Sequence, residues 1–70
     1  MSDTFWTIET DALPVNAARI ATETLGTYQS ASQGGRLGTE ITIAPYDRAE
    51  RVAAELREYG YATRMTPRKS

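Results

Sequence analysis

Residues 40–66 show two periodicities in succession, and this constrains the fold more than any other stretch. Residues 39–44 alternate polar and apolar side chains, with Ile41 and Ile43 on one side, as in a half-buried strand. Residues 47–59 repeat apolar side chains at helical spacing, and residues 61–66 alternate again before Pro67. The stretch therefore predicts a strand, a helix and a second strand. The apolar stripe of the helix consists of Ala49, Val52, Ala53, Leu56 and Tyr59.

Both ends of the predicted helix carry termination signals. Asp47 and Glu50 have the spacing of a capping box, with aspartate in place of the usual serine or threonine. Gly60 follows the last residue of the stripe, and glycine readily adopts the left-handed conformation that ends helices. We therefore expect the helix to begin at Asp47 and to end before Gly60.

The first part of the chain shows a weaker version of the same pattern. Residues 4–9 are rich in β-branched and aromatic side chains, which predicts a strand with Trp6 and Ile8 on its buried face. Residues 12–25 predict a helix that ends at Gly26, with Pro14 in the first turn and Thr10 or Asp11 as the N-cap. The predicted buried stripe of this helix consists of Leu13, Ala17, Ile20, Ala21 and Thr24.

Residues 27–38 leave two alternatives. Residues 27–32 predict a poor strand, and residues 33–38 contain the glycines of a turn, so the two would form a hairpin with the strand that begins near Thr39. The other alternative is a loop without regular structure over residues 27–38, which is uncommon in compact domains. The same glycines also resemble a phosphate-binding loop, but such loops lead into a helix, whereas here they lead into a predicted strand.

The two halves together predict the fold class. A shift of 35 residues lays Trp6 on Ile41 and Ile8 on Ile43, and a shift of 34 lays Gly26 on Gly60. Two strand–helix–strand units give the order βαββαβ, and right-handed crossovers place both helices on one face of the sheet. We predict one α+β domain over residues 1–70: a ferredoxin-like two-layer sandwich with a four-stranded antiparallel sheet. Residues 1–3 and 67–70 are predicted to be disordered tails.

Composition argues against most catalytic chemistries. The chain has no histidine and no cysteine, so the usual general base near neutral pH and the usual thiol nucleophile are missing. The single lysine, Lys69, lies in a predicted tail. We therefore predict that the protein is not an enzyme, and that it has no catalytic residues, no cofactor and no metal site.

The face of the predicted sheet that lies away from the helices is the candidate binding surface. Strand alternation places there one aromatic residue, several threonines and charges of both signs. With the arginine at the tip of the predicted hairpin, the residues predicted to contact a partner are Phe5, Thr7, Arg36, Glu40, Thr42 and Arg64. A net charge of −1 does not favour a strongly charged partner.

The preferred hypothesis is a small non-enzymatic module that binds a protein, as an adaptor or inhibitor, or that forms a homodimer through the sheet. The absence of cysteine and of a long apolar run favours a cytoplasmic protein without membrane contact, of the kind found among phage or mobile-element accessory proteins. The second hypothesis is a nucleic-acid-binding sheet that uses Phe5, Arg36, Arg64 and the basic C-terminal tail. A third is a ligand-sensing domain that dimerises edge to edge.

Overall fold

The computed structural model describes residues 4–68, in which six elements follow in the order strand, helix, strand, strand, helix, strand. They are β1 (Trp6–Thr10), α1 (Pro14–Leu25), β2 (Ser32–Gly34), β3 (Gly38–Ile43), α2 (Tyr46–Glu58) and β4 (Thr63–Pro67). Of the predicted disordered tails, residues 1–3 and 69–70 lie outside the described residues. Pro67 is in β4, and the backbone N of Arg68 donates to the carbonyl of Phe5, so residues 67–68 are ordered, contrary to the prediction.

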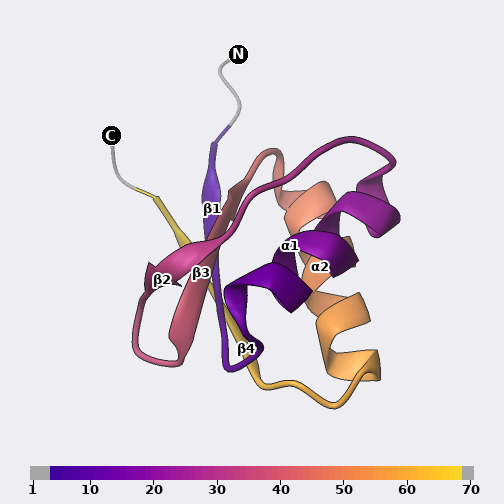
Figure 1. The fold of residues 1–70 in the computed structure, drawn as a ribbon. Helices are drawn as coiled ribbons and strands as arrows, with labels where there is room; N and C mark the ends of the chain where they lie inside the picture. Colours follow the sequence, from indigo (N-terminus) through magenta and orange to yellow (C-terminus); the bar gives the residue numbers. More distant parts are fainter. Residues whose placement is uncertain (1–3, 69–70) are drawn as a thin grey trace.

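The strands form one antiparallel sheet in the order β2-β3-β1-β4, and both helices cover the same face of it (Figure 1). The register pairs Ile8 with Ile41 and Trp6 with Ile43 across the two central strands. The predicted α+β domain, with two helices and a four-stranded antiparallel sheet, is therefore confirmed.

The core lies between this face of the sheet and the helices. Side chains alternate along β1 and β3, so Ile8, Ile41 and Ile43 all point toward the helices and are buried. The helices meet them with the apolar residues Ala17, Ile20, Ala21, Ala49, Val52, Ala53 and Leu56. Burying a side chain as large as leucine or isoleucine stabilises a fold by about 1.5–3 kcal/mol, so these contacts set the position of the sheet relative to the helices.

Trp6 lies at one end of this core and is half-buried. Its ring packs edge to face against Tyr46, with centroids 4.9 Å apart and an angle of 68° between the planes. This arrangement suits the quadrupoles of two aromatic rings and closes the core where α2 begins.

The N-caps predicted for both helices are wrong. Helix α1 begins at Pro14, two residues after the predicted start. The proline lies in the first turn, as predicted, but Leu13 is the N-cap and no side chain of residues 4–68 caps the helix. The hydroxyl of Thr10 accepts instead from the backbone N of Ala12 at 3.3 Å, and Asp11 accepts from the backbone N of Ala62 at 3.0 Å. Both side chains therefore hold the turn that precedes the helix.

Helix α2 begins one residue before the prediction, with Pro45 as the N-cap. Asp47 lies inside the first turn, where its negative charge interacts favourably with the positive end of the helix dipole. It does not form the predicted capping box. At the other end, Gly60 has a φ of +94° and follows the C-cap Tyr59. The backbone N of Gly60 donates to Arg57 and that of Tyr61 donates to Leu56, which is the Schellman pattern, so the predicted role of Gly60 is confirmed.

The predicted strand over residues 27–32 is displaced toward the turn. The hairpin itself is present, but β2 covers only Ser32–Gly34 and pairs Ser32 with Glu40. The hydroxyl of Thr22 in α1 accepts from the backbone N of Gln29 at 3.0 Å and donates to its carbonyl at 3.3 Å. Because both backbone groups of Gln29 are bonded to the helix, this segment is not available to the sheet.

Candidate functional site

The open face of the sheet, opposite the helices, carries two rows of polar side chains. No helix or strand within residues 4–68 covers this face (Figure 1). In one row Thr7 of β1 lies between Thr42 of β3 and Thr66 of β4. Phe5, just before β1, lies beyond this row and is 53% exposed. The alternation on which the prediction of the open face depended therefore holds in the structure.

The second row brings three charged residues side by side. Glu9 of β1 pairs with Glu40 of β3 on one side and with Arg64 of β4 on the other. Two carboxylates directly opposite each other destabilise a strand pair, whereas Arg64 has the opposite charge. The centre of the open face is therefore acidic, with a positive charge at its β4 side.

The tip of the β2–β3 hairpin folds toward Glu9. The backbone N of Arg36 donates to Oε2 of Glu9 at 3.1 Å. Gly35 has a φ of +72°, and a Cβ atom on it would lie 2.6 Å from the same carboxylate oxygen. The predicted hairpin turn is correct, and its backbone does bind an anion, but the anion is the chain's own glutamate.

A shallow polar hollow of about 250 Å³ lies on the open face beside β2. Nη1 of Arg68 crosses the face and donates to the hydroxyl of Thr42 at 3.4 Å. The predicted residues Glu40 and Thr42 therefore line this hollow together with three residues from the β2 side. The full lining consists of Ser30, Ala31, Ser32, Glu40, Thr42 and Arg68. Lys69, the other residue of the predicted basic tail, lies outside the described residues.

The structure brings most of the predicted contact residues onto one surface. Thr7, Glu40, Thr42 and Arg64 lie on neighbouring strands of the open face. Arg36 differs, because its backbone reaches Glu9 while its side chain is exposed at the hairpin tip. The contact between Glu9 and the tip was not predicted, since nothing local in the sequence indicates which carboxylate the turn would meet.

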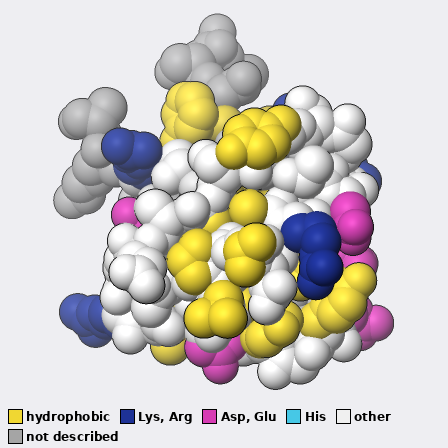
Figure 2. Space-filling view, in the orientation of Figure 1, with side chains coloured by type: hydrophobic (Ala, Val, Ile, Leu, Met, Phe, Trp, Pro, Cys, Tyr) yellow, Lys and Arg dark blue, Asp and Glu magenta, His cyan; other side chains and the backbone are white. Residues whose placement is uncertain are grey.

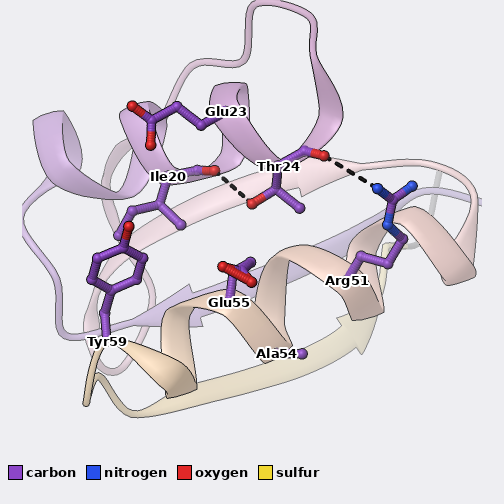
Figure 3. A pocket seen from close by; sticks show the side chains of 7 residues that line it. All are labelled: Ile20, Glu23, Thr24, Arg51, Ala54, Glu55 and Tyr59. Atoms are coloured by element: carbon purple, nitrogen blue, oxygen red, sulfur yellow. Dashed lines mark hydrogen bonds between the residues drawn. The ribbon is translucent and has the colours of Figure 1, made fainter.

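A second hollow lies on the other side of the molecule, in the groove between the helices, with a volume of about 480 Å³ (Figure 3). Nη2 of Arg51 reaches from α2 to the carbonyl of Thr24 at 3.2 Å, near the end of α1. Helix α1 has no basic residue in its own last turn, so Arg51 supplies the positive charge that stabilises the negative, C-terminal end of its dipole. Tyr59 points toward Ile20 across the groove (Figure 3).

Hydrophobic side chains also gather over the start of α1 (Figure 2). Leu13 is 64% exposed and Val15 is 72% exposed. The prediction that Leu13 belongs to the buried stripe is therefore wrong. Leu13 precedes the first helical residue, so its side chain does not follow the helical period. Val15 lies off the stripe of buried residues in α1. An apolar residue off the buried stripe of a helix is exposed, so this position could have been found from the sequence.

Among residues 4–68, no three acidic side chains lie close enough together to hold a metal ion. In the same part of the chain, neither helix combines the length and the apolar composition needed to cross a membrane.

In comparisons with known proteins, no family model, no curated protein and no solved structure matches the chain.

Proposed function

We propose that the protein is a small cytoplasmic binding module that contacts a protein partner through the open face of its sheet. It acts as an adaptor or inhibitor by contact alone, without catalysis, of the accessory kind that phages and mobile elements encode. The observation that carries the proposal is the uncovered face, on which Phe5, the threonine row and the charges of Glu40 and Arg64 lie together. Aromatic residues and arginine are enriched in protein interfaces, and the rims of such interfaces are polar.

We infer that the fold is the ferredoxin-like arrangement. Support comes from the order of elements and from the sheet order β2-β3-β1-β4. The two strands that lead into helices, β1 and β3, lie at the centre, and the strands that follow the helices lie outside them. This is the placement that two interleaved strand–helix–strand units require.

The size of the open face favours a protein partner over a homodimer formed by the sheets alone. Strands spaced about 4.8 Å apart and about 17 Å long give a four-stranded face of roughly 300 Å². A standard interface buries about 800 Å² on each partner. Contact between two such faces alone is therefore too small, and a partner must also contact the surroundings of the face, such as the hairpin tip or a sheet edge.

The acidic centre of the face disfavours nucleic acid. A backbone phosphate that approaches the sheet meets the carboxylates of Glu9 and Glu40. Sheets that bind RNA stack bases on aromatic residues of the central strands, whereas β3 presents Glu40 and Thr42. Phe5 and the exposed Arg68, which are hydrogen-bonded to each other just beyond the ends of β1 and β4, are the features that favour nucleic acid.

Affinity capture from native host lysate, followed by mass spectrometry, tests the proposal when it is done with two matched variants. Thr42→Arg adds a large charged side chain to the open face. Ala54→Arg adds the same side chain to the exposed surface of α2. We expect one protein to be enriched by the unmodified chain and by Ala54→Arg, and to be lost with Thr42→Arg. Loss with Ala54→Arg alone, enrichment that nuclease abolishes, or no enriched protein would contradict the proposal.

A further inference from the structure

The outer edge of β4 has backbone groups that no strand within residues 4–68 uses. Among the strands that the structure describes, β4 is the last in the sheet and pairs only with β1. The backbone N of Arg68 donates to Phe5, so the pair formed by Phe5 and Arg68 is a hydrogen-bonded pair. Hydrogen-bonded and non-hydrogen-bonded pairs alternate along an antiparallel ladder, so Thr63 and Met65 belong to non-hydrogen-bonded pairs with β1. Their N–H and carbonyl groups therefore point away from β1, toward the outside of the sheet.

Pro67 agrees with this assignment. It belongs to the same alternation as Thr63 and Met65, so its missing N–H is on the outer edge and breaks no bond to β1. The opposite edge of the sheet offers fewer backbone groups to an added strand, because β2 has three residues and ends at Gly34. Of the two edges, β4 is the one with room for an added strand.

Positive charge flanks the β4 edge on both faces of the sheet. Arg64 is exposed on the open face. On the helix side, Nη1 of Arg57 at the end of α2 donates to the hydroxyl of Thr63 at 2.9 Å. A strand added beside β4 would lie next to these two guanidinium groups, so acidic side chains on it would be favoured and basic ones disfavoured.

The same residues act against pairing of β4 with a second copy of itself. A two-fold axis through Arg64 would let Thr63 bond to Met65 of the other copy, but it would also set the two Arg64 side chains directly opposite each other. A two-fold axis through Met65 would place Pro67 opposite Thr63 and lose one hydrogen bond at each end. Both symmetric registers at the middle of β4 are therefore disfavoured, as is common for protected edges.

We propose that the β4 edge takes an extended, acidic segment of the protein partner as a fifth strand. The inference rests on the proposed function, because it names the chemistry by which the partner extends its contact beyond the open face. Backbone bonds to Thr63 and Met65 supply the affinity, and the charge of Arg64 selects for acidic side chains.

Two blocked six-residue peptides test the inference, one of alternating valine and glutamate and one of alternating valine and lysine. Fluorescence anisotropy gives their dissociation constants, and amide hydrogen exchange followed by NMR gives the protection of Thr63 and Met65. We expect the acidic peptide to bind about twofold to fivefold more tightly than the basic one. We also expect it to slow exchange at both amides.

Four variants make the test specific. Arg64→Glu should reverse the preference between the peptides, whereas Arg19→Glu, with the same change in charge on the exposed surface of α1, should preserve it. Thr63→Pro removes one outer N–H without breaking a bond to β1, and Thr63→Val is its control, because it also loses the hydroxyl that accepts from Arg57 but keeps the N–H. The proline variant should bind the acidic peptide about fivefold more weakly than the valine variant. Equal binding of both peptides, no binding of the acidic one, or unchanged exchange at Thr63 and Met65 would overturn the inference. These results would leave the capture experiment with Thr42→Arg unaffected, so the two proposals fail separately.

Discussion

Replacing Gly35 with alanine tests how the hairpin tip is held on the open face. Gly35 and Gly26 both have a φ of +72°, so alanine would occupy the left-handed region at either position. The two sites differ in what the new Cβ atom would meet. At Gly26 no atom of residues 4–68 other than those of the glycine and its chain neighbours lies within 4 Å of that Cβ, whereas at Gly35 the carboxylate oxygen of Glu9 lies at 2.6 Å and its Cγ at 2.9 Å. Gly26→Ala is therefore a matched control for backbone strain.

The expected difference in stability between the two variants comes from a hydrogen bond of Glu9 that is lost only in Gly35→Ala. Alanine in the left-handed region costs about 1–2 kcal/mol at either position. At Gly35 the side chain of Glu9 must also move, which breaks its hydrogen bond from the backbone N of Arg36. A bond to a charged group contributes about 1.5–3 kcal/mol, and the lower end applies to this exposed pair. Gly35→Ala should therefore lower the free energy of unfolding by about 1.5 kcal/mol more than Gly26→Ala.

Urea denaturation measures the difference, with the fluorescence of the single tryptophan, Trp6, as the signal. In thermal melts the same difference corresponds to about 6–12 °C for a domain of this size. The double variant Glu9→Ala/Gly35→Ala supplies the cross-check, because without the carboxylate the cost at Gly35 should fall to that at Gly26. Equal costs for the two single glycine variants, or an excess at Gly35 that persists without Glu9, would show that the carboxylate of Glu9 does not hold the hairpin tip.

Two further predictions concern stability, and both can be measured by the same denaturation. Leu56→Ala removes a fully buried side chain and should cost about 2–5 kcal/mol, whereas Leu13→Ala, at a position 64% exposed, should change the free energy of unfolding by less than about 0.5 kcal/mol. Similar costs for the two would show that Leu13 is buried. Thr39→Val should cost about 1–3 kcal/mol, because the buried hydroxyl of Thr39 donates to the carbonyl of Ala12 and its loss leaves that carbonyl unpaired. A neutral Thr39→Val would mean that water replaces the hydroxyl.

The sequence predicted the elements whose signals are local and repeated. Helix α2 combines a strong apolar stripe with Gly60 at its end, and the structure agrees with both except that the helix begins one residue earlier than predicted. The prediction that Tyr59 belongs to the buried stripe is wrong, because Tyr59 is the C-cap and is 61% exposed. The alternation along β1 and β3 predicted which residues face the helices. These patterns depend only on the periods of helix and strand, so they can be seen without knowledge of the rest of the fold.

The predictions that were wrong concern segments whose conformation depends on a residue distant in the sequence. Residues 27–31 could have paired with β3, but Thr22 in α1 binds both backbone groups of Gln29. The carboxylate of Asp11, interpreted as a helix cap, binds the backbone N of Ala62, which lies 51 residues away. No pattern within a short window of sequence specifies such partners.

The candidate site divides in the same way. Alternation along strands predicted that Thr7, Glu40, Thr42 and Arg64 share a face, because that conclusion requires only the strands and their period. The contact of Glu9 with the hairpin tip depends on the register of β1 against β3 and on the shape of the turn. The outward direction of the Thr63 and Met65 backbone depends on the register with β4. Register between strands is a property of the folded sheet, so these features required the structure.

Photo-crosslinking in the native host tests most directly the claim that the open face contacts a protein partner. A benzophenone amino acid placed at position 42 lies on the open face, and the same amino acid at position 54 lies on the exposed surface of α2. We expect one discrete protein adduct from position 42 and none of that mass from position 54. An adduct from position 54 without one from position 42, or the absence of any protein adduct from position 42, would contradict this claim.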